Sequence, residues 1–171
     1  MNKILALLIT LLVTLNVFSQ DNYLKLPQAK TQNPTYIFNK NSIGNESLLN
    51  NLGNTKQEIS DTIEEISVLK DKPNRENSDY FNLTEYGIVL VELKDDIICK
   101  TQEELIEFFK LPKQTDLYID GYLLENKNYK IALTAIKEIE IVEPNTENGL
   151  KSSVLNIWTL VKNERYSDKV N

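Results

Sequence analysis

The sequence contains no histidine, one cysteine and one tryptophan in 171 residues. Without histidine, the chain lacks Ser–His and Cys–His catalytic pairs and the most common zinc ligand. A single cysteine forms no intramolecular disulfide, so hydrophobic packing has to hold the fold together. We interpret Cys99, between Ile98 and Lys100, as a small buried apolar residue; the alternative is a reactive thiol or an intermolecular disulfide. The formal net charge of −6 excludes nucleic acid as a favourable partner, because an acidic surface repels phosphates.

The N-terminus has one early cation, Lys3, followed by an apolar segment over residues 4–18. This segment is shorter than the roughly 20 residues that a membrane-spanning helix needs. We therefore predict a signal peptide over residues 1–19, cleaved after Ser19, and no membrane span in the mature chain. The predicted location is the periplasm, the outer-membrane surface or the exterior. The alternative is an uncleaved anchor helix.

Two segments of the chain, 63–70 and 136–143, share one pattern of apolar and acidic residues. When they are aligned, Ile66 corresponds to Ile139 and Val68 to Ile141, and an apolar strand follows each segment. Such repetition predicts a duplicated unit. We expect an α+β fold in which two strand–helix–strand–strand units, 35–98 and 115–161, share one mixed sheet with short helices.

The remaining segments are predicted to connect or flank the two units. Residues 20–34 are polar and interrupted by prolines, which is typical of a flexible leader, and residues 162–171 form a charged tail. Residues 99–114 contain the clearest helix. Thr101 and Glu104 form a capping box, and Leu105, Phe108 and Phe109 are spaced to share one face.

These segments resemble the plug domain of TonB-dependent outer-membrane receptors of the Bacteroidetes type. One plug element is similar to residues 117–121, a second is similar to residues 63–71, and Tyr86 and Gly87 precede a strand in the place where the plug has a comparable pair. The resemblance implies binding to, or assembly with, an envelope protein. An outer-membrane barrel needs many strands of about ten residues, and the sequence after the plug-like segments is too short for one. The resemblance therefore implies a freestanding plug-like module without the barrel. It transfers no catalytic residue.

The sequence shows no recognisable nucleophile–base pair or set of metal ligands, so we predict a non-enzymatic protein without cofactor or metal. The oxygen-rich loop 71–79 lacks the glycine of a calcium-binding loop, and Glu138 and Glu140 are interpreted as the solvated side of a strand. Two alternatives stay open: an exported enzyme that uses carboxylates or a lysine, and a structural envelope protein.

The predicted partner-binding residues are Trp158, Asn156 and Tyr122. Asn156 and Trp158 interrupt the apolar run of the last strand, which predicts an edge position where a partner adds a strand. Tyr122 follows the turn at Asp120 and Gly121, so we expect it to be exposed. The alternative is that the aromatic side chains belong to the core.

Overall fold

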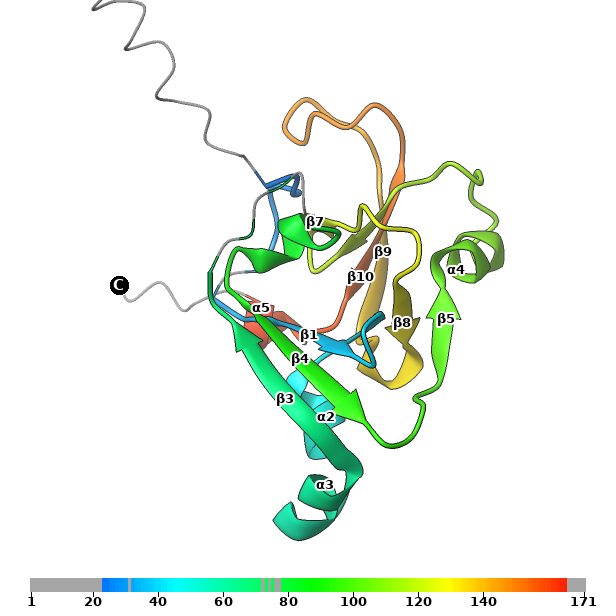
Figure 1. The fold of residues 1–171 in the computed structure, drawn as a ribbon. Coiled ribbons are helices and arrows are strands. Elements are labelled where there is room, and N and C mark those ends of the chain that lie inside the picture. The colour runs from blue at the N-terminus through cyan, green and yellow to red at the C-terminus, as the bar shows by residue number, and fades with distance from the viewer. Residues whose placement is uncertain (1–22, 31, 72, 74, 76–77, 166–171) are drawn as a thin grey trace, which may run out of the picture.

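The computed structural model describes residues 23–30, 32–71, 73, 75 and 78–165, and it confirms the α+β class (Figure 1). The strands form two mixed sheets rather than the single shared sheet that the sequence predicts. None of the described helices is long and apolar enough to cross a membrane. The predicted signal peptide over residues 1–19 lies outside the described residues.

The larger sheet has six strands in the order β3-β4-β1-β2-β8-β5. Most of it comes from the first unit: β1 (Thr35–Phe38), β2 (Ser42–Gly44), β3 (Ile63–Leu69) and β4 (Ile88–Leu93). The connecting segment adds β5 (Cys99–Thr101), and the second unit adds β8 (Lys130–Ala132). Along the chain, the helices α2 (Glu46–Asn50) and α3 (Lys56–Thr62) connect β2 to β3, and the 3-10 turn η2 (Phe81–Thr84) precedes β4.

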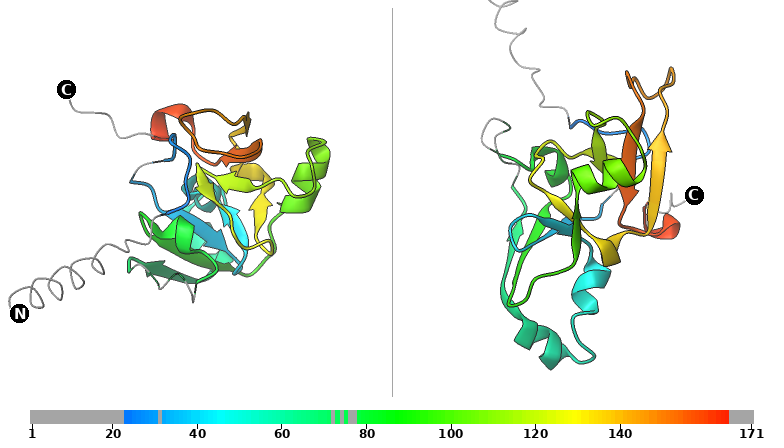
Figure 2. Two further views of the ribbon diagram at one scale, coloured as in Figure 1. Left: turned by 90° about the horizontal axis from the view of Figure 1, so that it is seen from above. Right: turned by 90° about the vertical axis from the view of Figure 1, so that its right-hand side faces the viewer.

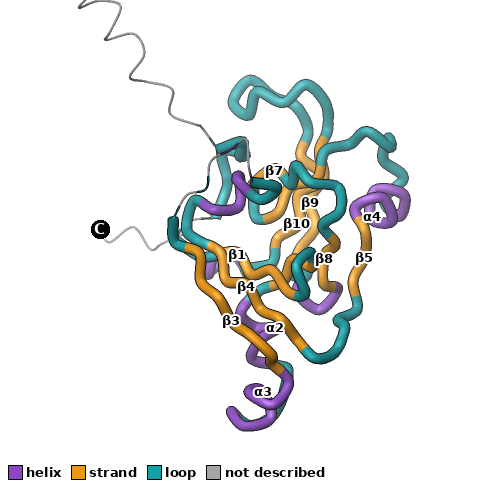
Figure 3. The backbone as a smooth tube through the Cα atoms, viewed as in Figure 1, coloured by secondary structure: helices purple, strands orange, loops and turns teal. Residues whose placement is uncertain are grey.

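The smaller sheet has four strands, all from the second unit, in the order β7-β6-β10-β9. They are β6 (Leu117–Ile119), β7 (Tyr122–Leu123), β9 (Glu138–Val142) and β10 (Val154–Trp158). The 3-10 turn η3 (Leu133–Ala135) leads into β9, and α5 (Lys162–Arg165) follows β10. The smooth backbone in Figure 3 shows how little of the chain is helical.

The two units have the same strand order and the same strand directions. In the first, β4 pairs antiparallel with β3 and parallel with β1, which forms a hairpin with β2. In the second, β10 pairs antiparallel with β9 and parallel with β6, which forms a hairpin with β7. The register also agrees with the sequence alignment, because Ile66 lies opposite Val91 in β4 and Ile139 lies opposite Ile157 in β10.

Equivalent hydrogen bonds fix the same register in both units. Asn39 N–H donates to the carbonyl of Val91, and Asp120 N–H donates to the carbonyl of Ile157, each at 2.9 Å. The side chain of Asn39 accepts from Leu93 N–H, and that of Asp120 accepts from Thr159 N–H, each at 2.7 Å. Both residues have positive φ, 45° for Asn39 and 51° for Asp120, which short polar side chains tolerate in turns.

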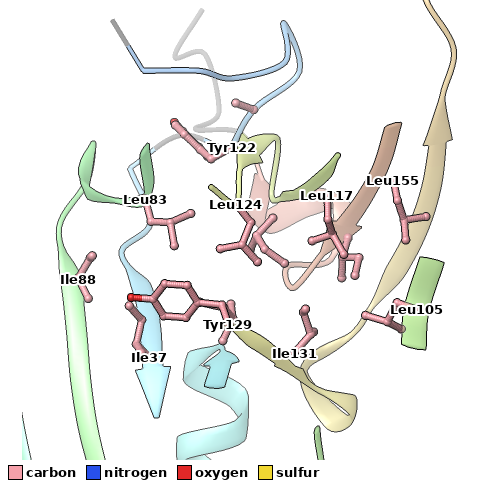
Figure 4. Packing of buried hydrophobic residues seen from close by; sticks show 14 residues of the cluster. Ile37, Leu83, Ile88, Leu105, Leu117, Tyr122, Leu124, Tyr129, Ile131 and Leu155 are labelled. Carbon is pink, nitrogen blue, oxygen red and sulfur yellow. The ribbon is translucent and has the colours of Figure 1, made fainter. Parts of the chain in front are cut away.

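A shared core joins the units, with side chains from both sheets meeting in one cluster (Figure 4). Ile37 and Ile88 come from the first unit, Leu117 and Leu155 from the second, and Leu105 from the connecting helix. All five are at most 5% exposed. Strand β8 also connects the two units, because it belongs to the second unit and pairs parallel with β2 of the first. The two units therefore form one packed body, visible from three directions in Figures 1 and 2.

The leader does not behave as the flexible segment that the sequence predicts. Leu26 and Ala29 are buried, Leu26 N–H donates to Gly121, and Leu123 N–H donates to Leu24. The leader thus covers the outer edge of β7, and Gly121 accommodates it: a Cβ at this position would lie 2.5 Å from the Cα of Ala29. Described residues of the leader belong to the fold because they complete the second sheet.

The connecting helix α4 (Gln102–Phe108) has the predicted capping box between Thr101 and Glu104. Its predicted apolar face is partly wrong. Leu105 and Ile106 are buried, whereas Phe108 is 77% exposed. Cys99 is half-buried beside the first unit's second apolar cluster, and it is a free thiol.

Candidate interaction surface

The three residues predicted to bind a partner are all buried. Trp158, Asn156 and Tyr122 are at most 1% exposed. The edge prediction is also wrong, because β10 pairs with β6 on one side and with β9 on the other. Asn156 and Trp158 instead form an internal hydrogen-bond network. The leader and α5 cover this face of β10, so neither side chain reaches solvent.

Asn156 and Trp158 converge on one carboxylate. The indole N–H of Trp158 donates to Glu140 at 3.1 Å, and the Asn156 amide donates to the same oxygen at 3.4 Å. Arg165 covers the Trp158 ring with its guanidinium carbon 4.1 Å from the ring centroid, and it donates to Glu138 at 2.5 Å. The contact with Arg165 lowers the pKa of Glu138. Glu138 and Glu140 therefore bind side chains from α5 and β10, respectively.

Tyr122 lies apart from this network, beside the leader. Its hydroxyl donates to Glu85 at 2.5 Å and lies 3.1 Å from the Lys30 carbonyl. Burial and the neighbouring Glu85 raise the pKa of Tyr122. These contacts tie the leader, the first unit and the second unit together at one point.

A second buried polar group joins the same three parts of the chain. The Lys30 ammonium donates to Thr35 at 2.8 Å and lies 3.8 Å from the Asp120 carboxylate. Burial lowers the pKa of Lys30, against the opposing effect of Asp120. Such a lysine has the chemistry for covalent catalysis. However, its side chain is only 4% exposed and its neighbours occupy the ammonium, so a substrate has no access to it.

Strand β3 provides the longest free sheet edge in the described part of the chain. It has seven residues and pairs only with β4. The competing edges are shorter or covered, since β5 has three residues, β9 has five, and the leader lies along β7. Figure 1 shows β3 at the outer margin of the larger sheet. An edge strand presents unpaired backbone groups to which another strand can bind.

Apolar side chains are exposed on β3. Ile66 is 48% exposed and Val68 is 55% exposed, although their register partners on β4, Val91 and Val89, pack in an apolar cluster. Helix α2 packs in that cluster through Leu48, and Ile63 at the start of β3 also packs there, but Ile66 and Val68 stay exposed. On this face of the sheet, the side chains of β1 and β4 are therefore packed in the cluster, whereas Ile66 and Val68 of β3 are exposed to solvent.

The other face of β3 carries an unusual charge arrangement. Glu65 lies directly opposite Glu92 of β4, so the two carboxylates share one face of the sheet. Within the described residues neither carboxylate forms an ion pair, and Glu65 accepts a 3.1 Å hydrogen bond from Ser67. Like charges directly opposite each other destabilise a sheet. Polar–apolar alternation along residues 65–68 is the sequence signal that could have identified this half-exposed strand.

Another apolar surface is a hollow of about 250 Å³ beside α4. It is lined mainly by apolar side chains from α4, η3 and the start of β9. No group of three or more potential metal ligands occurs among the described residues. Part of the loop 71–79 is outside those residues, so its interpretation as a solvated loop rather than a calcium site stays a prediction.

Comparison of the chain with models of known protein families, with curated proteins and with solved structures finds no match.

Proposed function

We propose that this protein is an exported, non-enzymatic binding module that captures an extended segment of an envelope protein at the free edge of β3. The observation that carries the proposal is the combination of a long free edge with exposed apolar side chains at Ile66 and Val68. In strand addition, the backbone supplies hydrogen bonds and alternate side chains supply specificity. The predicted signal peptide and the plug resemblance support an address in the periplasm or at the outer-membrane surface.

Two alternatives make different demands on the surface. An exported enzyme needs an accessible reactive group, and the buried Lys30 is closed to substrates. A structural envelope protein also needs contacts with neighbours, but it does not require that one edge strand carry them. Binding through β3 is therefore the proposal that the geometry supports best.

The experiment compares partner capture by the wild-type protein with capture by the double substitution Ile66→Lys and Val68→Lys. Immobilised protein is incubated with envelope extract, and retained proteins are identified by mass spectrometry. Both side chains are exposed, so the fold tolerates lysine while the charged edge resists strand addition. We expect the specifically retained protein to disappear from the double variant.

Two matched controls place lysine on other exposed apolar positions. Phe108→Lys changes α4, and Ile141→Lys changes the residue of β9 that corresponds to Val68. Both controls should retain the partner. Hydrogen exchange on the purified pair should then show slower exchange of the β3 amides. Loss of capture in the Ile141→Lys control, with capture kept by the double variant, would assign binding to β9 and refute the proposal.

A further inference from the structure

The second unit contains a cation at the position where the first unit has two unneutralised carboxylates. By strand register, Glu65 corresponds to Glu138, and Glu92 corresponds to Trp158. Arg165 occupies the second-unit position: its guanidinium donates to Glu138 at 2.5 Å and lies over the Trp158 ring. Lys162 adds a more distant contact, 3.7 Å from Glu138. The protein itself therefore shows how this position of the shared fold binds a guanidinium.

The first unit has the anionic part of this arrangement without its cation. At the position of Trp158 in the second unit, the first unit has a second carboxylate, Glu92. The additional negative charge favours a bound cation more strongly. No ion pair to Glu65 or Glu92 is formed by the residues that the structure describes. Two carboxylates side by side on one face of a sheet match the two-pronged geometry of arginine.

The register also determines where the missing cation has to come from. A strand that adds to β3 has one residue directly opposite Glu65, and residues paired across strands extend from the same face. The side chain of that residue therefore lies beside Glu65, which in turn lies beside Glu92. On the opposite face, the neighbouring residues of the added strand meet Ile66 and Val68.

From these contacts we infer that Glu65 and Glu92 form the protein's half of a guanidinium site, which an arginine in the captured segment completes. The inference rests on the proposed strand addition at β3 and specifies its partner: an extended segment with apolar residues on one face and an arginine on the other. A second copy of this chain is a poor occupant, because each copy carries a net charge of −6 and the free edge is itself acidic.

The test uses three synthetic nine-residue peptides in which valine and threonine alternate around one central residue. That residue is arginine, its neutral analogue citrulline, or glutamate. Each peptide is titrated into the isotopically labelled full-length protein, and amide chemical shifts are followed by NMR. We expect shifts along β3 and β4, with the arginine peptide binding about five to ten times more tightly than the citrulline peptide and the glutamate peptide binding most weakly.

Matched variants assign the preference to the carboxylate pair. Glu65→Gln should remove the preference for arginine over citrulline, and so should Glu92→Gln. Glu64→Gln makes the same charge change next to Glu65, but at a bulge without a register partner, so it should preserve the preference. Preserved preference in both Glu65→Gln and Glu92→Gln overturns the inference.

The outcomes separate this inference from the proposed function. Equal binding of the arginine and citrulline peptides, with shifts still on β3, refutes the guanidinium site and leaves strand addition standing. Absence of β3 shifts with every peptide refutes both. Tighter binding of the arginine peptide with shifts confined to other strands also refutes the site.

Discussion

Replacement of Trp158 by alanine measures how strongly the second unit depends on its buried tryptophan. The side chain is 1% exposed, donates to Glu140 at 3.1 Å and lies beneath the guanidinium of Arg165. Truncation of a buried tryptophan to alanine costs roughly 3 to 5 kcal/mol, and a desolvated cation–π contact contributes about 2 kcal/mol of such a loss. Total stabilities of domains are about 5–15 kcal/mol. We therefore expect Trp158→Ala to leave a marginally stable protein.

The assay is thermal unfolding followed by far-ultraviolet circular dichroism, because Trp158 is the only tryptophan and its removal abolishes tryptophan fluorescence. The expected melting temperature is about 10 to 20 °C lower than that of the wild type. Trp158→Phe is the matched control, since it keeps an aromatic ring beneath Arg165 and should lose less than half as much. A melting temperature within about 2 °C of the wild type would refute the assignment of Trp158 to the core.

Three further substitutions test the like-charge pair, a buried tyrosine and the glycine of a turn. Glu65→Gln should raise the free energy of unfolding by about 0.2–1 kcal/mol, because it removes the repulsion from Glu92, and Glu64→Gln should change it less; urea titration at low salt measures both. Burial raises the pKa of Tyr129 from 10.0 to about 12, so its stabilising contribution is complete below pH 10 and is lost as the pH rises to 12. Between pH 9 and pH 11 the wild type should therefore lose about 1.4 kcal/mol more than Tyr129→Phe, and equal losses would contradict the assignment. Gly121→Ala should destabilise the protein by at least about 1–2 kcal/mol in thermal melts, because φ is +86° and the added Cβ meets Ala29; an unchanged melt would show that the leader is not packed there.

The sequence predicts local structure and repetition well because both depend on neighbouring residues. The capping box at Thr101, the turn at Asp120 and Gly121, and the correspondence of Ile66 with Ile139 need only short patterns. The structure agrees with each of them. The sheet partners of a strand depend instead on residues far away in the chain, which explains why one shared sheet was expected and two are found.

The candidate site was misplaced for the same reason. Asn156 and Trp158 make β10 look half-exposed, because polar and aromatic residues interrupt its apolar run. Only the fold brings Arg165 and the leader over that face, where Glu140 satisfies both side chains. The exposure of Ile66 and Val68 depends on which distant segments pack over the sheet, which is likewise a long-range property.

Each sheet pairs with a segment from the other half of the chain, since the leader lies along β7 and β8 pairs with β2. This arrangement affects the order in which the chain becomes structured. The Tyr122 hydroxyl meets the Lys30 carbonyl across 92 positions, and β2 of the first unit pairs with β8 of the second. Neither sheet is complete until the second half of the chain is available, and contacts of such high sequence separation slow folding. In a chain emerging from a ribosome or a translocation pore, β1 to β4 have their partners within the first unit, but the second edge of β2 stays unpaired until β8 is available. Until β8 arrives, the first unit therefore has two open sheet edges, β3 and β2, instead of one.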